Sequence, residues 1–180
     1  MKKQNKGNIK MMYKKRYRTP DLCDDIILIS DGEYLTGLYF ENSYNALTAL
    51  KNSIDEHLPV FEMTEKWLDI YFSGKSPDFI PPYRLCGATP FRQCVSDIIR
   101  QIPYGKTVSY GDIASEIAQK RNIKKMSAQA VGGAVGWNPI CIIIPCHRVI
   151  GANGRLVGYG GGIKNKEYLL RHERITAAGL

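Results

Sequence analysis

The chain has 180 residues, of which 44% are hydrophobic and 23% are charged, with five cysteines and a formal net charge of +8. This length allows one large domain or two small ones. No run of about 18 apolar residues occurs, so we expect no membrane-spanning helix, and the basic N-terminus lacks the apolar core of a signal peptide. The cysteines show no C-x-x-C spacing, which argues against a zinc site or a redox dithiol. Their odd number in a chain without a secretion signal suits a reducing cytosol.

The charges are unevenly distributed. Residues 1–18 carry eight Lys/Arg and no acid, residues 19–85 carry four Lys/Arg against twelve Asp/Glu, and residues 86–180 carry thirteen against five. The distribution favours two modules, over 1–85 and 86–180. A basic C-terminal module suits a polyanion such as nucleic acid, although a solvated lysine-rich surface explains the charge equally well.

The N-terminal module is expected to be a small α/β unit. Its first eight residues have the composition of a disordered segment. Alternating apolar residues, turn signals and helical spacing then predict the following elements: a strand beginning near Ile9, strands over 26–30 and 34–40 joined by a turn at Asp31-Gly32, a helix over 45–51, and an amphipathic helix capped by Thr64.

The C-terminal module is expected to be mainly helical. Helices are predicted over 91–102, 110–120, 128–137 and 165–174, the second capped by Ser109 and the third by Ser127. The second and third, joined by a short basic turn, form a helix-turn-helix candidate. The third contains three glycines, each costing about 1 kcal/mol relative to alanine. Its small face should therefore lie close against another surface, either a neighbouring helix or a DNA groove.

The run over 142–147, Ile-Ile-Ile-Pro-Cys-His, is the main candidate for chemistry. Three β-branched residues predict a buried strand, and the proline ends it. Cys146 then lies beside a possible base, His147, as expected of an activated nucleophile. Taken alone, the Cys146-His147 pair fits an inert, packed cysteine better than a nucleophile. Cys141, five residues earlier, is interpreted as a packed strand residue. Glu173 lies near the end of the last helix, where the helix dipole opposes it; either a specific partner holds it or, as is more usual for such a residue, it is a surface acid.

Several motifs together resemble the O6-alkylguanine-DNA alkyltransferases. They are Pro145-Cys146-His147-Arg148-Val149, Gly132-Gly133-Ala134, Asn138-Pro139, the segment from Tyr104 to Tyr110, and Tyr159-x-Gly161-Gly162. The resemblance spans about residues 90–173, whereas 1–85 fit the variable N-terminal domain of this family only loosely. It implies an α+β fold, with a small RNase H-like α/β domain built on an antiparallel sheet and a mainly helical domain with a helix-turn-helix.

The resemblance also implies a function, DNA repair by a methyltransferase that acts once. An O6-alkylguanine, or an O4-alkylthymine, would be flipped out of duplex DNA, and its alkyl group would pass irreversibly to Cys146. His147 would act as the base through a bridging water, and Glu173 would orient it. Asn138 would brace the turn that presents the cysteine, and Tyr110 would donate a hydrogen bond to a guanine ring nitrogen.

The remaining implied roles concern binding. The substrate would meet the carbonyls of Cys146 and Val149, the N–H of Gly160 and the ring of Tyr159. DNA would be contacted by a set of residues in and around the third helix and the motif: Lys124, Lys125, Ser127, Ala128, Gln129, Ala130, Gly132 and Arg148. No cofactor, metal or membrane is implied, and the protein would be a cytoplasmic monomer, associated with the nucleoid if it is bacterial or archaeal.

Two positions depart from the family pattern, and three alternative functions stay open. Gln129 stands where the family commonly has arginine, and Gly160 where serine is common. The alternatives are a lesion-binding protein without transfer activity, a cysteine hydrolase built on Cys146, His147 and Glu173, and a helix-turn-helix regulator in which Cys146 is structural. The lesion-binding relatives lack the acceptor cysteine that this chain has.

Overall fold

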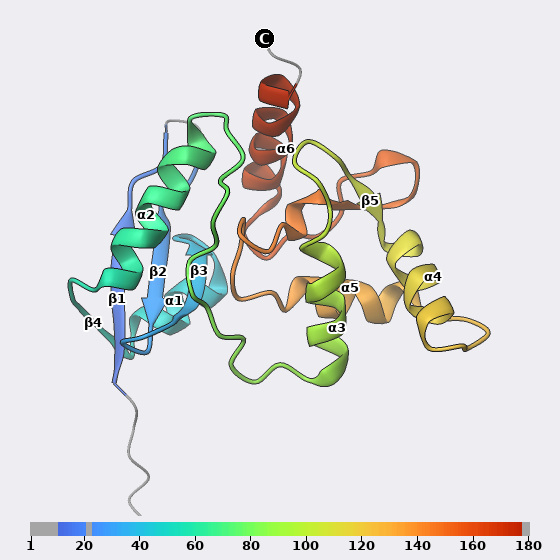
Figure 1. Ribbon diagram of the computed structural model, residues 1–180, viewed down its shortest axis with the longest axis horizontal. Helices are drawn as coiled ribbons and strands as arrows, with labels where there is room; N and C mark the ends of the chain where they lie inside the picture. The colour runs from blue at the N-terminus through green and yellow to red at the C-terminus, as the bar shows by residue number, and fades with distance from the viewer. Residues whose placement is uncertain (1–10, 21–22, 178–180) are drawn as a thin grey trace, which may run out of the picture.

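The computed structural model describes residues 11–20 and 23–177. The disorder expected over 1–8 and the strand start expected near Ile9 lie outside these residues. The elements in chain order are β1 (Met12–Tyr17), β2 (Ile26–Ser30), β3 (Leu35–Phe40), α1 (Tyr44–Leu50), β4 (Ser53–Asp55), α2 (Pro59–Phe72), α3 (Pro90–Ile99), β5 (Val108–Ser109), α4 (Tyr110–Lys120), α5 (Ala128–Gly136), a 3-10 turn (Cys146–Arg148), β6 (Val149–Ile150), a second 3-10 turn (Ala152–Gly154) and α6 (Ile163–Ala177) (Figure 1).

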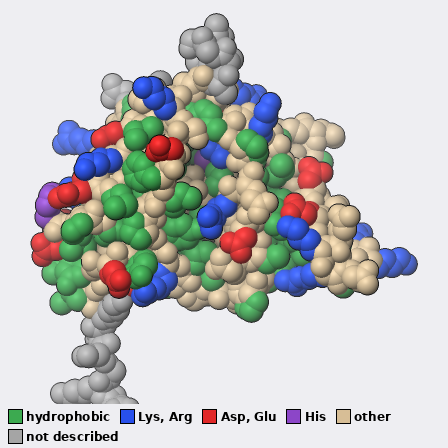
Figure 2. Space-filling model, in the orientation of Figure 1, with side chains coloured by type: hydrophobic (Ala, Val, Ile, Leu, Met, Phe, Trp, Pro, Cys, Tyr) green, Lys and Arg blue, Asp and Glu red, His purple; other side chains and the backbone are tan. Residues whose placement is uncertain are grey.

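The helix-turn-helix candidate is formed by α4 and α5, which pack side by side. Ser109 caps α4 in a capping box with Asp112, and Ser127 caps α5 by accepting from the N–H of Ala130, as predicted. The loop between the two helices is exposed and basic, and Figure 2 shows Lys and Arg side chains at this tip of the molecule. Among the described helices, none is long and apolar enough to cross a membrane.

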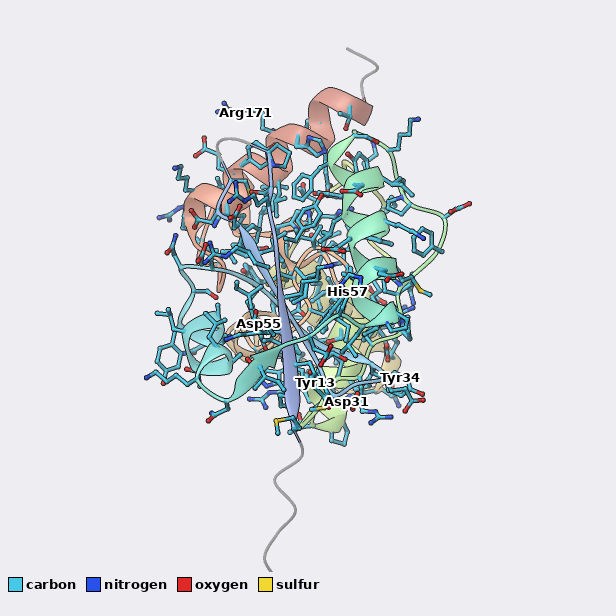
Figure 3. The ribbon with its side chains drawn as sticks, turned by 90° about the vertical axis from the view of Figure 1, so that its left-hand side faces the viewer. Tyr13, Asp31, Tyr34, Asp55, His57 and Arg171 are labelled. Carbon is cyan, nitrogen blue, oxygen red and sulfur yellow. The ribbon has the colours of Figure 1, made fainter. Side chains whose placement is uncertain are left out.

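The N-terminal sheet has the strand order β3-β2-β1-β4. The β1–β2 and β2–β3 pairs are antiparallel, whereas β4 is parallel to β1. Helices α1 and α2 lie on opposite sides of this sheet (Figure 3). The strands over 26–30 and 34–40 were predicted, but β4, with only three residues, is too short to show an alternating pattern.

The hydrophobic core joins the two halves of the chain. Strand β2 is buried on both faces, with Ile27 and Ile29 packing toward α1. Its other face, Ile26 and Leu28, belongs to a cluster that continues through α2 into α3, α4, α5 and α6. The site described below is therefore supported from both halves, while the division at residues 85 and 86 stays a prediction.

Helix α2 begins earlier than expected, so the prediction of Thr64 as its cap is wrong. The helix starts at Pro59, where a proline at the first turn loses no hydrogen bond. Thr64 lies inside the helix, fully buried, and its hydroxyl donates to the Val60 carbonyl at 2.7 Å.

The predicted strand over Ile142–Ile144 is also wrong. These residues are buried, as three β-branched side chains suggested, but they form a reverse turn. Ile142 has a φ of +67°, which β-branched residues rarely adopt, and the Ile144 N–H donates back to the Ile140 carbonyl at 3.0 Å. Cys146 consequently follows a folded-back turn and begins a 3-10 turn, where a strand end was expected.

Candidate active site

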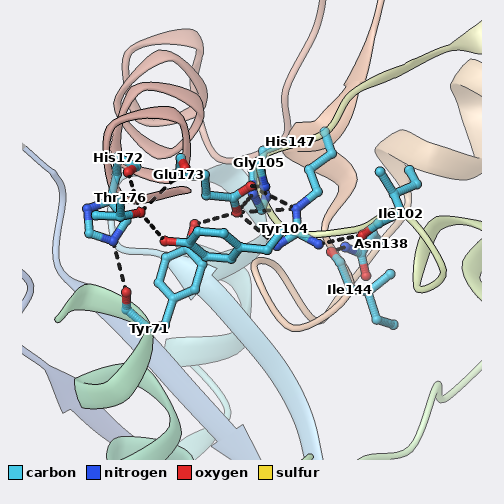
Figure 4. Close-up of polar contacts among 11 residues, drawn as sticks. Tyr71, Ile102, Tyr104, Gly105, Asn138, Ile144, His147, His172, Glu173 and Thr176 are labelled. Atoms are coloured by element: carbon cyan, nitrogen blue, oxygen red, sulfur yellow. Dashed lines mark hydrogen bonds and ion pairs between the residues drawn. The ribbon is translucent and has the colours of Figure 1, made fainter. Parts of the chain in front are cut away.

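Glu173 of α6 lies at the centre of a buried polar cluster and is 1% exposed. Its Oε1 accepts from the Tyr71 hydroxyl at 2.8 Å and pairs with His147 Nε2 at 2.7 Å. Its Oε2 accepts from the Gly105 N–H at 3.0 Å and from Arg148 Nε at 2.9 Å (Figure 4). Of the two interpretations of Glu173, the surface acid is therefore wrong, and four specific partners hold the carboxylate.

The protonation of this cluster follows from its geometry. Burial would raise the pKa of Glu173, but the hydrogen bonds from His147 and Arg148 and the charge of Arg148 outweigh burial and hold this pKa well below its usual range. Burial lowers the pKa of His147, which is therefore neutral near pH 7. Since an ionised carboxylate only accepts, His147 carries its proton on Nε2 and a lone pair on Nδ1. This Nδ1 is buried and has no hydrogen-bond partner among the described residues.

Arg148 is committed to this cluster, so its prediction as a DNA contact is corrected. Its side chain is 11% exposed. The guanidinium donates from Nε and Nη2 to the two oxygens of Glu173, and from Nη1 to the Ile102 carbonyl at 2.7 Å. It also lies 5.6 Å from the ring centre of Tyr104. All three guanidinium nitrogens are thus hydrogen-bonded inside the chain, which fits a buried structural cation better than a DNA contact.

Cys146 is held by the side chain of Asn138. The Asn138 Nδ2 donates to Cys146 Sγ at 3.0 Å and to the Ile144 carbonyl at 2.8 Å, while its Oδ1 accepts from the Ile140 N–H at 3.0 Å. One buried amide thus ties both ends of the reverse turn to the sulfur. Cys146 itself is 4% exposed.

The electrostatic surroundings favour ionisation of the Cys146 thiol over ionisation of the neighbouring Cys141 thiol. A hydrogen bond from the Cys141 thiol lowers the pKa of Cys146; burial opposes this, and Asn138 and the charge of Lys166 add to the lowering. The same thiol–thiol hydrogen bond, with burial, raises the pKa of Cys141. Cys141 was interpreted as a packed strand residue; it is packed, but it lies in the reverse turn and serves as a donor.

The other expected pocket residues differ in burial. Tyr110, the first residue of α4, is half-buried, and burial together with the nearby Cys146 raises the pKa of its phenol, which stays a donor at neutral pH. Val149 is fully buried, and its carbonyl accepts from Lys166 Nζ at 2.7 Å. The Tyr159 hydroxyl is buried, whereas Gly160 is exposed. A Cβ at Gly160 would lie an ordinary 3.6 Å from the Gly136 carbonyl, so the described residues leave room for a Cβ there.

The face of α5 that carries the predicted DNA contacts is exposed. Ser127, Ala128, Gln129 and Ala130 form its first turn, next to the exposed Lys124 and Lys125. Gly132 lies under the Tyr110 ring, where an added Cβ would be 3.8 Å from the nearest ring carbon, but Gly133 and Gly136 face open space. Packing against another helix therefore does not explain the last two glycines.

Four residues of the site were not predicted to belong to it: Tyr71, Tyr104, Gly105 and Lys166. Tyr71 comes from α2, 102 residues before Glu173, and helical spacing marked it only as apolar. Lys166 is buried although lysines are rarely so. A signal that could have found it is its position three and four residues before Leu169 and Leu170, on their face of the helix. Over residues 11–20 and 23–177, no group of three or more His, Cys, Asp or Glu is arranged to hold a metal ion.

Comparison with known proteins places this site in a family. Residues 90–175 match the family model described as 6-O-methylguanine DNA methyltransferase, DNA binding domain. The methylated-DNA–protein-cysteine methyltransferase of Haemophilus influenzae is 38% identical over 156 residues, which are 87% of this chain and 84% of that protein. The chain belongs to the methylated-DNA–protein-cysteine methyltransferase family. The family membership predicted from the motif around Cys146 is thereby confirmed.

Further members agree in sequence and in structure. The methyltransferase of the same name from Mycobacterium leprae is 49% identical over 116 residues, or 63% of this chain and 67% of that protein. The crystal structure of Mycobacterium tuberculosis O6-methylguanine methyltransferase superposes with a TM-score of 0.77 at 36% identity, covering 92% of this chain and 94% of that one. The structure of the Mycobacterium tuberculosis protein in complex with DNA gives a TM-score of 0.73 at 35% identity, with the same coverage. The α+β fold class is confirmed.

Proposed function

We propose that this methyltransferase repairs duplex DNA by moving the alkyl group of O6-alkylguanine, and of O4-alkylthymine, to Cys146. The observation that carries the proposal is the buried Cys146 sulfur, held at 3.0 Å by Asn138 beside a His147–Glu173 pair at 2.7 Å. A nucleophile, a base and a group that orients the base are the parts that covalent catalysis requires.

The thiolate forms by loss of the Cys146 proton to His147. The neutral imidazole offers its Nδ1 lone pair, and a bridging water carries the proton from the sulfur. Glu173 fixes the tautomer through Nε2 and balances the imidazolium that results. Arg148 keeps Glu173 ionised, so that the carboxylate does not take up the proton itself.

The transfer is a direct displacement at an sp³ carbon. The S–C bond forms as the bond from that carbon to O6 breaks, and the electron pair passes to the guanine. Tyr110 and the Gly160 N–H stabilise the leaving group by donating to a ring nitrogen and to O6. The carbonyls of Cys146 and Val149 accept from the guanine amino group, and Tyr159 lines the pocket. The product thioether has no carbonyl for water to attack, so each molecule reacts once.

DNA is the partner that this chemistry requires. The base must leave the helix to reach a buried sulfur, and weakly paired, damaged bases are extruded most easily. The exposed small-residue face of α5 is proposed to lie in a groove, with Lys124 and Lys125 at phosphates. The protein would act as a monomer in the compartment that holds DNA, the cytoplasm and nucleoid of a bacterial or archaeal cell.

Intact mass spectrometry tests the proposal and separates it from its alternatives. The protein is incubated with duplex oligonucleotide containing O6-methylguanine, with Cys146→Ala and Cys141→Ala as matched variants. We expect a gain of one methylene per protein molecule, lost in Cys146→Ala and kept in Cys141→Ala. Repeated turnover without an adduct would indicate a hydrolase. Binding of the lesion without an adduct would indicate a recognition protein, and binding without preference for the lesion a regulator.

A further inference from the structure

The pocket wall around Gly160 is a turn with little rigidity of its own. Residues 160–162 are all glycine, and Gly162 has a φ of +89°. One backbone hydrogen bond closes the turn, from the Gly162 N–H to the Tyr159 carbonyl at 3.0 Å. Glycine loses more conformational freedom on folding than any other residue, and three in succession offer no side chains that packing could hold. Contacts from elsewhere in the chain are therefore needed to fix this turn.

Asn165 of α6 supplies such a contact. It is 1% exposed, and its Nδ2 donates to the Gly161 carbonyl at 2.7 Å. The same Nδ2 donates to Asp24 Oδ2 at 2.9 Å, and Oδ1 accepts from the Asp24 N–H at 3.0 Å. A buried amide costs free energy unless its polar groups are paired, and here the nitrogen and the oxygen both have partners. The reciprocal bonds with Asp24 also fix the orientation of the amide, because the Asp24 N–H can only donate.

Asp24 belongs to the N-terminal half, 141 residues before Asn165. The Thr19 hydroxyl holds its loop by donating to the Cys23 carbonyl at 2.9 Å. Phe40 of β3, in the same half, packs against the buried Gly161. Two segments of the N-terminal half thus support the three-glycine turn, one through Asn165 and one directly.

We propose that Asn165, oriented by Asp24, is a positioning residue that holds the Gly160 N–H where the leaving O6 oxygen can accept from it. The role rests on the proposed function, in which this N–H stabilises the leaving group. A donor that is already in place needs no rearrangement when charge develops on the oxygen, and a shift of about 1 Å can lower a rate about a hundredfold. Asn165 acts through the Gly161 carbonyl, one residue along the chain from Gly160.

Single-turnover methyl transfer at increasing concentrations of duplex containing O6-methylguanine tests the proposal. The variants are Asn165→Ala and the exposed matched control Lys164→Ala, which should behave as the wild type. In Asn165→Ala we expect the rate constant at saturating duplex to fall about tenfold and the half-saturating concentration to stay within about twofold, because the α5 face is untouched. Alkylation of Cys146 by iodoacetamide, which has no O6 leaving group, should keep its wild-type rate. An unchanged transfer rate, or equal losses with both reagents, would overturn the proposal.

Two variants of Asp24 cover the case in which Asn165→Ala does not fold. Asp24→Ala removes the carboxylate that accepts from Asn165 Nδ2, whereas Asp24→Asn keeps an oxygen that can accept in its place. The transfer rate should fall about threefold in Asp24→Ala, the effect of one modest hydrogen bond, and return close to the wild-type rate in Asp24→Asn. A wild-type rate in Asp24→Ala would then overturn the proposal.

Amide hydrogen exchange separates this proposal from the proposed function. The Gly162 N–H reports on the turn without DNA and without methyl transfer, and its exchange should become about tenfold faster in Asn165→Ala and change less in Asp24→Ala. A wild-type protein that gives no adduct with O6-methylguanine would contradict the proposed function. A wild-type protein that forms the adduct, with variants that exchange and react as it does, would contradict the positioning role alone.

Discussion

The buried cluster around Glu173 and the exposed face of α5 are built in opposite ways. In the cluster, long charged side chains are held by several hydrogen bonds each, and Glu173 alone has four partners. On α5 the side chains are small, and Gly133 and Gly136 face open space. The chemical centre is therefore complete within the chain, whereas the α5 face has the form of a surface that a partner completes.

Because of this difference, mutations in the two regions should affect stability, reactivity and DNA binding differently. Changes in the cluster should lower stability and reactivity together, because the same hydrogen bonds maintain both. Changes on α5 should separate stability from DNA binding, because the face contributes little to the folded chain. Three substitutions test this contrast.

Glu173→Gln should have the largest effect. Removing one charge of a buried, hydrogen-bonded pair leaves Arg148 uncompensated, and we expect a loss of about 3 kcal/mol in the free energy of unfolding, together with loss of most methyl transfer. Urea unfolding and the adduct assay measure the two effects. Glu167→Gln, on the exposed face of the same helix, is the control and should change stability by less than about 0.5 kcal/mol.

The stabilisation by Glu173 should also depend on pH. Its pKa is lower in the folded protein than the ordinary 4.5. Its contribution is therefore fully present above that pH and decreases as the pH falls toward the folded pKa. The stability difference between the wild type and Glu173→Gln should accordingly narrow below about pH 4.5. A difference that stays constant down to pH 3 would contradict the role given to the carboxylate.

Gly133→Ala should have opposite effects on stability and binding. Nothing lies within 4 Å of the position that the new methyl group would take, and alanine stabilises a helix interior by about 1 kcal/mol relative to glycine. If the α5 face lies in a DNA groove, duplex affinity should fall by about fivefold, a comparable free energy. Thermal unfolding and fluorescence anisotropy measure the two. The control Thr48→Ala, at an exposed position of α1, should change stability and leave duplex affinity unchanged. If Gly133→Ala binds the duplex as tightly as the wild type, DNA does not lie against this face of α5.

Gln129→Arg should have the smallest effect, and it should raise duplex affinity where Gly133→Ala lowers it. An arginine at this exposed position adds a cation beside the duplex, so affinity should rise and the slope of log K against log salt should steepen by about 0.9 for one added phosphate contact. Titrations at several salt concentrations measure it. Gln93→Arg, at an exposed position of α3, adds the same charge on a different helix. Equal effects of the two variants would show that the charge matters and its position does not.

The sequence predicted best what depends on neighbouring residues. Ser109 and Ser127 cap the helices expected of them, because a cap is formed within three or four residues. Cys146 and His147 were identified because they are adjacent within a specific motif. Gln129 lies at the second position of α5 and is exposed, while its contact with DNA stays a prediction.

What depends on distant contacts could not be predicted. The β-branched run over 142–144 showed burial, but a left-handed Ile142 is imposed by the surrounding core and by Asn138. Arg148 resembles a DNA contact by charge, and only the folded chain brings it to Glu173. Lys164 and Lys166 are the same residue type two positions apart, and the orientation of α6 against the core determines which of them is buried.

Gly161 brings the loop that carries Tyr159 into close contact with β3 of the N-terminal half. A Cβ at Gly161 would lie 2.3 Å from the Phe40 ring and 2.8 Å from the Tyr159 ring, so the loop that carries the pocket wall presses its bare backbone against β3. The Phe40 and Tyr159 rings themselves are 6.1 Å apart. If Tyr159 lines the pocket as proposed, a substitution at Phe40 should change the space for the alkyl group without changing any residue proposed to contact the base.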